Sequence, residues 1–472
     1  MAERFTIRKI EGPNESIKCI KCKSRIQINS LNLCKRCFAL EQIVNSGNKN
    51  IDDFIKKSQS PKYGSIAKPF LEWVPYEKFT NVEYIGKGGF SEIYKATWEK
   101  LSMNYQEISE AKKTEVVLKV LNDSQNVDNE FIKELKNKCQ MKGANTIQCY
   151  GVTQIPKTKN YAFILEYAKY GDLHHFLNKN FVKITWRVKI LFLKNIVKGI
   201  GKIHKKKILY RDLHSGNILM NEIDKAIISD LGFSQPATIK PNLSRNSQIY
   251  GIIPNMAPEL FKGQSHLYSS DIYSLGMIMW QLTSGHRPFH DQEHGPKLIL
   301  DILDGKRPEI TEDTPKCWAD LMKRCWRSDP SQRPTIKEIY KLTDKFDYYK
   351  WRQGHFKKHY PDMWLEFNKA EKKRYEMVKS KKPFVKNPGY EHPNSRNYSM
   401  SLNSMLESIN SIITDIYSND NLFSNDHFDI NSFDQINDLE NSDGNSSVEN
   451  NRKHFLDESP PQEIIEDQND YK

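Results

Sequence analysis

The order of two periodicities constrains the fold of this chain more than any other feature. From about residue 76 to residue 346, strand-like runs come first and helical periodicity comes afterwards. The runs, rich in β-branched and aromatic residues, are Val82–Gly86, Glu92–Trp98, Val116–Leu121, Ile147–Val152 and Tyr161–Glu166. Apolar residues at helical spacing follow, for example at Ile190, Leu193, Val197 and Ile200. Strands that precede helices, instead of alternating with them, predict an α+β fold with two lobes.

A glycine-rich turn lies between the first two of these runs and reads I-G-K-G-G-F-S-E-I. Glycines allow the backbone to approach phosphates without a Cβ in the way, and the two isoleucines can cover a flat base. A glycine-rich hairpin turn without a ligand explains the same string, so this motif needs the support of others. Its candidate nucleotide contacts are Ile85, Gly86, Lys87, Gly88, Gly89, Phe90, Ser91 and Ile93.

A lysine on an apolar strand is the second feature of this kind. Lys119 ends the run V-V-L-K, and Glu134 follows fifteen residues later in F-I-K-E-L, which has a helical pattern. A Lys–Glu pair between strand and helix would hold the ammonium group over two phosphates. Glu130 lies one helical turn before Glu134 and could take the ion pair instead. A strand-edge lysine that reaches water is the structural alternative.

Two carboxylates and an amide follow at short spacing between apolar stretches. Asp212 and Asn217 lie in Y-R-D-L-H-S-G-N-I-L, and Asp230 lies in S-D-L-G-F. Hard oxygen ligands at this density suit Mg²⁺, which keeps several waters and bridges phosphates. One carboxylate would remain to accept a hydroxyl proton.

In this order, the motifs resemble those of the eukaryotic protein kinase domain, over about 270 of the 472 residues. The resemblance implies a bilobal fold, with a small antiparallel β-rich lobe that contains one helix and a large helical lobe. It implies ATP and Mg²⁺ as cofactors, Asp212 as the catalytic base, and Lys119 with its partner Glu134 as phosphate-binding residues. It also implies that Asn217, a catalytic-loop residue, and Asp230 are the magnesium ligands.

The resemblance extends to the adenine pocket and to structural anchors. The positions it carries over are Leu165 as gatekeeper, Glu166 and Ala168 in the adenine-binding hinge, Val117 and Leu219 on the faces of the adenine, Ala257–Pro258–Glu259 at the end of the activation segment, Asp271 as an anchor, and Arg333 as the salt-bridge partner of Glu259. The string Phe70–Ser91 and the R-D-L-H-S-G-N loop are similar to the tyrosine-kinase-like groups expanded in arbuscular mycorrhizal fungi, which often carry an N-terminal paired-cysteine segment.

The sequence departs from the kinase pattern in two ways. Ser91 in place of a glycine, Tyr210 in place of a histidine and Leu231 in place of a phenylalanine remove no catalytic group. His214 and Ile252 instead replace the Lys and Thr that usually bond around the catalytic base of serine/threonine kinases. We therefore expect an active protein kinase that acts on serine or threonine. Tyrosine specificity stays open, because positions 214 and 252 match neither the serine/threonine-kinase pattern nor the tyrosine-kinase pattern. The alternative is a pseudokinase scaffold that binds ATP and partners without transfer.

Three residues of the presumed activation segment are candidate phosphorylation sites, namely Ser244, Ser247 and Tyr250. Arg211, next to Asp212, would belong to the basic pocket that a phosphorylated segment can occupy. Ordinary polar loop residues would give the same string.

Two C-x₂-C pairs near the N-terminus, Cys19 with Cys22 and Cys34 with Cys37, are separated by eleven residues. With no secretory signal in the sequence, this spacing indicates a structural Zn²⁺ site of four thiolates rather than disulfides. A redox pair or unligated turns are the alternatives. The surrounding basic residues could contact nucleic acid, although a protein-docking or structural role is favoured.

Composition sets the remaining boundaries. The hydrophobic fraction of 38% lies below the usual range of about 45–50%, which predicts a part without a packed core. The net charge of +12 conceals a basic stretch, from Lys369 to Lys386, that precedes a strongly acidic tail. The expected regions are a zinc-ribbon-like module at 14–42, a linker at 43–75, the kinase-like domain at 76–347, a basic helical extension at 348–386, and an acidic, Asn/Ser-rich disordered tail at 387–472.

Location and partners follow from the same features. No run approaches the roughly 18 apolar residues of a membrane span, and the first twelve residues lack the apolar core of a signal peptide. We therefore expect an intracellular protein of the cytoplasm or nucleus that takes part in signalling. Its expected partners are protein substrates and proteins that dock on the cysteine module or the tails.

Overall fold

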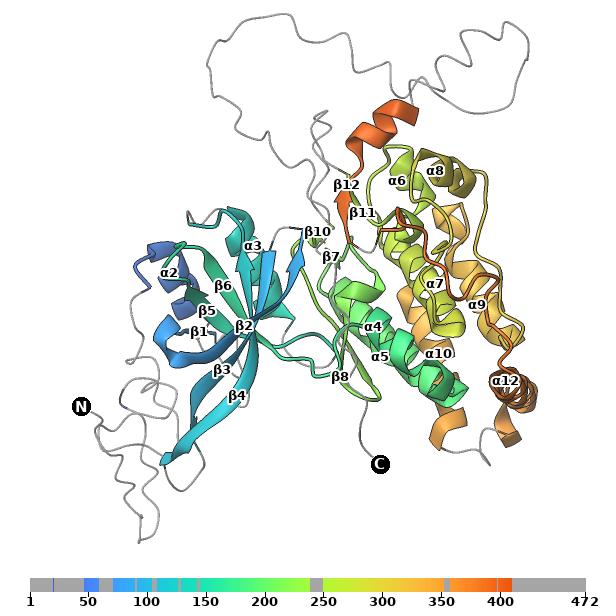
Figure 1. Ribbon diagram of the computed structural model, residues 1–472, viewed down its shortest axis with the longest axis horizontal. Coiled ribbons are helices and arrows are strands. Elements are labelled where there is room, and N and C mark those ends of the chain that lie inside the picture. The colour runs from blue at the N-terminus through green and yellow to red at the C-terminus, as the bar shows by residue number, and fades with distance from the viewer. Residues whose placement is uncertain are drawn as a thin grey trace, which may run out of the picture. The chain divides into compact units, whose positions relative to one another are not determined.

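The structure is a computed structural model that describes residues 20, 46–58, 71–89, 91–103, 108–125, 129–141, 145–237, 249–351, 357–396 and 398–409. These residues belong to one compact unit, residues 1–413. Several sequence predictions lie outside them, namely those for Cys19, Cys22, Cys34, Cys37, Phe90, Ser244, Ser247 and the chain beyond residue 409. The described elements form a sheet-rich lobe and a helical lobe, as expected (Figure 1).

A six-stranded sheet with the order β1-β5-β6-β4-β3-β2 forms the small lobe. Its strands are β1 (Glu72–Trp73), β2 (Phe79–Gly88), β3 (Ser91–Met103), β4 (Ile108–Leu121), β5 (Cys149–Gln154) and β6 (Tyr161–Glu166). All neighbours pair antiparallel except β1, which runs parallel to β5. The five strand-like runs of the sequence therefore all lie in this sheet, and β1 is the strand that their pattern does not predict.

Two helices, α2 (Lys49–Ser58) and α3 (Asn129–Gln140), accompany the sheet. Ile51 and Ile55 of α2 are fully buried in a cluster with residues of α3, β5 and β6. The prediction that residues 43–75 form only a linker is therefore wrong for α2 and β1. The short apolar pattern of Ile51, Phe54 and Ile55 is compatible with one or two helical turns, and the surface that covers it comes from distant residues.

The large lobe is helical and carries three short β ladders. Its helices are α4 (Leu173–Asn180), α5 (Trp186–Lys205), α6 (Pro258–Phe261), α7 (Tyr268–Ser284), α8 (Pro296–Leu303), α9 (Lys316–Cys325), α10 (Ile336–Trp351) and α12 (Pro361–Lys379). The ladders pair β7 (Ile208–Leu209) with β10 (Gln235–Pro236), β8 (Ile218–Glu222) with β9 (Lys225–Ile228), and β11 (Tyr250–Gly251) with β12 (Met400–Ser401). Short 3₁₀ turns lie at Tyr76–Lys78, Phe181–Lys183, Ser215–Asn217, Ile253–Asn255 and Pro330–Gln332.

The core of this lobe fixes the β8–β9 hairpin, which lies in the chain between Asn217 and Asp230. Helix α5 packs against β9 so closely that a Cβ on Gly199 would lie 2.6 Å from the side chain of Ile228. Helix α7 is buried almost all round, which explains why its sequence is apolar on every face. The hairpin is therefore held by helices whose own apolar faces are fully covered.

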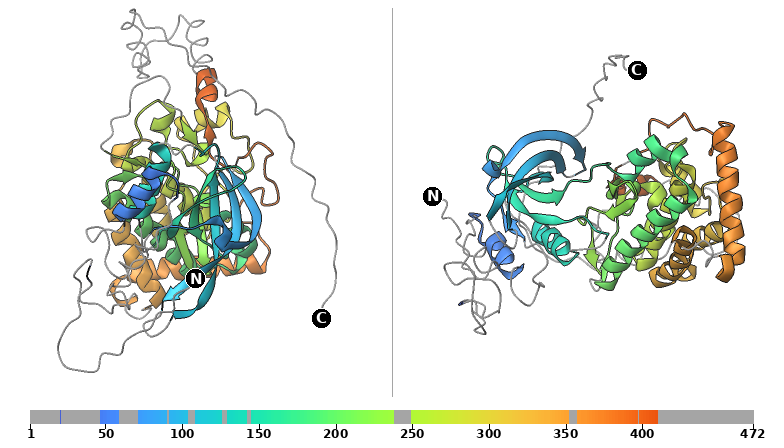
Figure 2. Two further views of the ribbon diagram at one scale, coloured as in Figure 1. Left: turned by 90° about the vertical axis from the view of Figure 1, so that its left-hand side faces the viewer. Right: turned by 90° about the horizontal axis from the view of Figure 1, so that it is seen from below.

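The C-terminal extension packs on the large lobe further than the sequence predicts. Helix α12 contacts α5 and α9 and lies on the side of the helical lobe remote from the sheet (Figure 2). Beyond it, residues 387–396 bond to the loop between α7 and α8, and residues 398–409 include β12. The predicted start of the disordered tail, residue 387, is therefore wrong. Sparse apolar residues such as Leu402 and Ile409 are buried because the large lobe supplies the groove that covers them.

The basic stretch has internal partners as well. Lys373 and Lys382 both pair with Glu312, at 3.2 and 2.5 Å, and Lys386 pairs with Glu309 at 2.8 Å. Part of the positive charge of the extension thus lies against acidic residues of the large lobe. Among the described residues, no helix combines the length and apolarity needed to cross a membrane.

Candidate active site

Lys119, Glu134 and Asp230 meet between the two lobes. The side chains of β4 alternate, so that Val116, Leu118 and Val120 are buried on one face of the sheet while Lys119 lies on the other. Its Nζ lies 3.3 Å from Glu134 Oε1 on α3 and 2.7 Å from Asp230 Oδ1. Glu134 therefore contacts the lysine, as the motif order predicts.

The electrostatics of this cluster keep Lys119 and Asp230 charged. Burial by itself would lower the pKa of Lys119, but the nearby carboxylates of Asp230 and Glu134 hold that pKa above its ordinary value. Burial would likewise raise the pKa of Asp230, yet Lys119 and Lys138 hold it well below its usual range. Lys138, one turn after Glu134 on α3, lies 3.1 Å from Glu134 Oε1 and was not singled out by the sequence.

Asp212 and Asn217 form the second part of the site. The Asn217 amide donates from Nδ2 to the backbone oxygen and to Oδ2 of Asp212, both at 3.0 Å. The amide nitrogen is thus engaged, and Asn217 Oδ1 is the atom that a metal ion could use. One carboxylate, on Asp230, and one amide oxygen fit the donor set of Mg²⁺, which retains several waters in proteins.

Asp271 holds the backbone of this loop in place. Its carboxylate accepts the N–H groups of Tyr210 and Arg211 at 2.9 Å and contacts His204 and His266 at 2.8 and 2.9 Å. Burial would raise the pKa of Asp271, but the bonds to the two histidines keep it well below its usual range. Arg211 has a φ of 75°, a region that non-glycine residues rarely adopt, so these bonds stabilise an otherwise unfavourable backbone.

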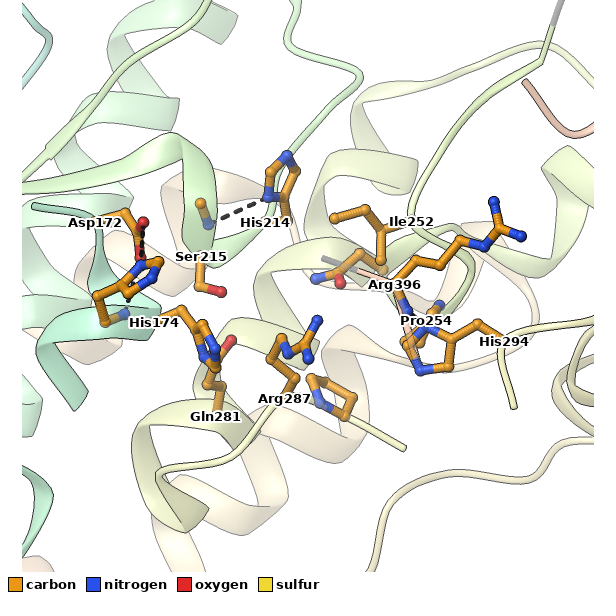
Figure 3. A pocket seen from close by; sticks show the side chains of 14 residues that line it. Asp172, His174, His214, Ser215, Ile252, Pro254, Gln281, Arg287, His294 and Arg396 are labelled. Atoms are coloured by element: carbon orange, nitrogen blue, oxygen red, sulfur yellow. Dashed lines mark hydrogen bonds and ion pairs between the residues drawn. The ribbon is translucent and has the colours of Figure 1, made fainter. Parts of the chain in front are cut away.

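His214 lies beside the Asp212 carboxylate. His214 Nδ1 accepts the N–H of Gly216 at 3.2 Å, and its Nε2 lies 3.6 Å from Asp212 Oδ2. Ile252 is buried and lines the pocket that His214 also lines (Figure 3). The bond to Gly216 therefore holds the ring with Nε2 on the side of Asp212.

The other departures from the kinase pattern have structural partners. The hydroxyl of buried Tyr210 donates to the backbone oxygen of Ser229 at 2.8 Å, which ties the two motifs together. Leu231 and Ser91 are both buried. Arg333 forms a bidentate pair with Glu259, at 2.8 and 2.7 Å.

The presumed adenine-side residues converge from three strands. Val117 on β4, Leu165 on β6 and Leu219 on β8 pack in one apolar cluster. Glu166 accepts from Asn221 Nδ2 at 2.7 Å, and Ala168 is buried just beyond it. Strands that are far apart in the sequence thus supply one apolar wall.

The glycine-rich turn is the tip of the β2–β3 hairpin, with Gly88 opposite Ser91 and Lys87 opposite Glu92. A Cβ on Gly86 would meet no atom within 4 Å, so packing does not explain this glycine. Ile85 is 46% exposed and Ile93 half-buried. The space next to Gly86 is therefore open.

A pocket beside the catalytic loop is lined by several histidines and arginines, of which the sequence singled out His214 alone (Figure 3). Its lining includes His174, His175, His214, His294, Arg287 and Arg396. Burial lowers the pKa of both His174 and His294 to about 4, so these rings are neutral near pH 7. Because Arg396 belongs to the C-terminal extension, that extension forms part of the wall.

A second contact from the extension reaches the candidate base itself. Ser399 Oγ donates to Asp212 Oδ1 at 2.5 Å. No motif in the sequence indicates a role for this serine.

Among the described residues, no group of three or more His, Cys, Asp and Glu side chains is arranged to hold a metal ion. The four N-terminal cysteines lie outside those residues. Tyr250 is described and forms part of β11.

Comparison with known proteins agrees with this geometry. Residues 79–342 match the family described as protein tyrosine and serine/threonine kinase. The chain is 28% identical over 307 residues to a probable serine/threonine-protein kinase of Dictyostelium discoideum, which covers 62% of this chain and 16% of that protein. It is 28% identical over 285 residues to the dual specificity protein kinase splA of the same organism, covering 55% of this chain and 11% of the relative.

A third relative is mitogen-activated protein kinase kinase kinase 7 of Homo sapiens, 27% identical over 279 residues, which are 58% of this chain and 42% of that protein. The chain spans less than half the length of each of these relatives.

Proposed function

The chain belongs to the protein tyrosine and serine/threonine kinase family, and from this premise we propose that it transfers the γ-phosphoryl group of ATP to a hydroxyl of a protein. The observation that carries the proposal is the meeting of Lys119, Glu134 and Asp230 beside the Asp212–Asn217 pair. Such a constellation positions a triphosphate and a hydroxyl, which is nearly all that phosphoryl transfer requires of a protein.

The chain's own residues have separable tasks in this reaction. The Lys119 ammonium, held by Glu134, binds phosphate oxygens, and the β2–β3 hairpin covers them. Mg²⁺, held by Asp230 and Asn217, supplies charge neutralisation at the β- and γ-phosphate oxygens. Because Asp230 now contacts Lys119 at 2.7 Å, the ammonium and the metal would share this carboxylate.

Asp212 orients the acceptor hydroxyl and accepts its proton. The bond from Asn217 Nδ2 to Asp212 Oδ2 fixes the orientation of this carboxylate, and His214 Nε2 lies 3.6 Å from the same oxygen. We infer that His214 replaces the missing lysine and threonine by steadying Asp212, which favours retained activity. Serine and threonine are the proposed acceptors because the first relative named above is described as a probable serine/threonine-protein kinase, while the second is described as a dual specificity protein kinase.

The proposal is tested with the full chain, Mg-ATP and dephosphorylated casein as acceptor. Asp212→Asn and Lys119→Met should each lower phosphate incorporation by about 10²-fold or more, because they remove the base and the phosphate-binding cation. Lys113→Met is the matched control, since Lys113 lies on the same strand with its side chain 72% exposed. Equal incorporation by the wild type and both active-site variants would refute the assignment of these residues.

A pseudokinase scaffold is the second candidate function. Two observations favour it: the His214 and Ile252 replacements, and the contact of Ser399 with Asp212, which occupies the acceptor position. Under this alternative the chain binds ATP, seen as a rise in melting temperature, but casein and the chain itself stay unlabelled.

Further proposals concern the regions outside the kinase match. We propose that Cys19, Cys22, Cys34 and Cys37 bind one structural Zn²⁺ within residues 14–42, and that this module docks proteins inside the cell rather than nucleic acid. Metal analysis of the purified chain should give about one zinc per molecule, lost in Cys19→Ser/Cys22→Ser. The Phe70–Ser91 string and the R-D-L-H-S-G-N loop support a place in the tyrosine-kinase-like group.

A further inference from the structure

Residues 398–409, which we call the acceptor segment, lie in the groove next to the catalytic loop (Figure 1). Ser399 Oγ bonds to Asp212 Oδ1 at 2.5 Å, where a base would meet its acceptor hydroxyl. The backbone oxygen of Ser399 also lies 3.4 Å from the position that a Cβ on Gly89 would take. The serine thus lies between the catalytic carboxylate and the turn proposed to cover the phosphates.

Backbone pairing fixes the register of the segment. Met400 lies opposite Gly251 and Ser401 opposite Tyr250 in the β11–β12 ladder. The N–H of Leu402 donates to Ile249 O at 2.8 Å, and the N–H of Ile249 donates to Asn403 Oδ1 at 2.9 Å. Bonds through the backbone place an extended peptide beside the catalytic loop, a common way for a protein to hold a peptide.

Apolar burial anchors the same segment just beyond the ladder. Leu402 is 0% exposed and Ile409 is 4% exposed, and residues 403–409 between them are helical. Their cluster on the large lobe consists of Ile253, Met256, Phe261, Phe289, Leu298, Ile299 and Ile302. This groove therefore selects an apolar residue three positions after the serine.

The preceding residues of the chain lead the segment to this position. The N–H of His392 donates to His290 O at 2.8 Å, and the N–H of His294 donates to Asn394 O at 3.2 Å. The N–H of Arg396 donates to His294 Nδ1 at 3.1 Å. The tether ends three residues before Ser399, so the serine is delivered to Asp212 by its own chain.

We propose that the acceptor segment is an internal substrate of this kinase and that Ser399 is its phosphorylation site, modified within the same molecule. The inference rests on the proposed function. In the reaction, Ser399 Oγ forms a bond to the γ-phosphorus of ATP, and the bond from that phosphorus to the bridging oxygen breaks. The electron pair leaves with ADP, and the hydroxyl proton passes to the Asp212 carboxylate and then to solvent.

The position of the serine also explains how the product leaves. A phosphoserine carries about −1.5 to −2 charge near pH 7, and here it would lie against the Asp212 carboxylate. Repulsion between these anions weakens the hold on the segment. Transfer to Ser399 therefore opens the acceptor position to other protein substrates, whose serine would be followed by an apolar residue three positions later.

The test is a time course of the full chain with Mg-ATP, in which mass spectrometry maps each phosphorylated residue and casein reports general activity. Ser399 should be phosphorylated with a first-order rate that stays constant when the enzyme concentration is raised tenfold. Asp212→Asn chains mixed with wild type should remain unmodified at Ser399. A rate proportional to concentration, or labelling of the inactive chains, would overturn the intramolecular assignment.

Variants of the segment separate this inference from the proposed function. Ser399→Ala should lose the modification, while Ser401→Ala, which removes a hydroxyl two residues along the same strand, should keep Ser399 labelled. Leu402→Asp should slow Ser399 labelling about tenfold or more without slowing casein phosphorylation, because it removes the apolar anchor. Unchanged labelling in Leu402→Asp would count against the groove.

The two failures are distinguishable. Labelled casein with an unmodified Ser399 would overturn the internal-substrate inference and leave the proposed function intact, and would identify the segment as a purely inhibitory occupant. If neither casein nor the chain is labelled, the proposed function itself fails, and the inference fails with it.

Discussion

Two buried ion pairs in this molecule have opposite designs. Arg333 and Glu259 in the large lobe are almost completely enclosed, with side chains 0% and 2% exposed. Lys119 in the site between the lobes pairs with Glu134 and with Asp230, whose side chain is 31% exposed. One pair is closed, whereas the other keeps an open carboxylate that a ligand can reach.

The difference extends to the hydrogen bonds. All five guanidinium N–H groups of Arg333 are satisfied, by both Glu259 oxygens and the backbone oxygens of Ser269, Arg327 and Ser328. Lys119 has two carboxylate partners, and Glu134 is shared with Lys138. A saturated pair stabilises the fold, while a shared pair can exchange partners when phosphates and a metal arrive.

The largest expected effect comes from breaking the closed pair. Arg333→Met should lower the free energy of unfolding by roughly 3–5 kcal/mol, because it leaves the Glu259 carboxylate buried without its partner. Thermal unfolding should show a fall in melting temperature of roughly 10 °C. Arg333→Lys keeps the charge but loses the planar guanidinium group. Its melting temperature should therefore lie between those of the wild type and Arg333→Met. An unchanged melting temperature in Arg333→Met would show that this pair does not hold the lobe together.

Lowering the pH should reduce the difference in melting temperature between the wild type and Arg333→Met. In the wild type, burial would raise the pKa of Glu259, but the bond to Arg333 holds that pKa below the ordinary value for a glutamate. The stability this pair contributes is therefore present above about pH 4.5 and is lost as the pH falls through the lowered folded-state pKa.

In Arg333→Met the pKa of Glu259 should instead be raised, because a buried carboxyl without its partner is easier to bury when protonated. The gap in melting temperature between variant and wild type should thus shrink from pH 7 to pH 4. A gap that widens on acidification would contradict the role given to Glu259.

The smallest stability effect is expected for the open pair. Lys119→Met should cost about 1 kcal/mol or less, since Glu134 keeps Lys138 at 3.1 Å and Asp230 is partly exposed to water. The same variant should lose almost all phosphoryl transfer. If its melting temperature fell as far as that of Arg333→Met, the two pairs would not differ in design.

Much of the fold follows from local patterns. The five strand-like runs lie in β2 to β6 because alternation and β-branched residues are local signals. Helix α2 and strand β1 escaped prediction because their burial depends on α3 and β5, residues far away in the chain. Residues 387–409 are predicted to belong to the disordered tail because the sequence there is polar on average. In the structure, however, Leu402 is buried in a groove of the large lobe.

The candidate site divides in the same way. The contact of Lys119 with Glu134 is predicted from the motif order, and the structure places the two groups 3.3 Å apart. Lys138 and Ser399 were missed because a lysine on a helix and a serine in a polar stretch carry no signal of their own. Both gain meaning only from the carboxylates placed beside them.

By itself, the sequence determined the order of strands and helices and the identity of the charged groups that handle phosphate, since residue type and short spacing are written in the chain. The tertiary structure alone decided which charged groups share a carboxylate and which serine reaches Asp212. Ser399 and Asp212 are 187 residues apart in the chain. Their contact depends on how the packed lobes and the C-terminal extension position the backbone, and no local sequence pattern encodes it.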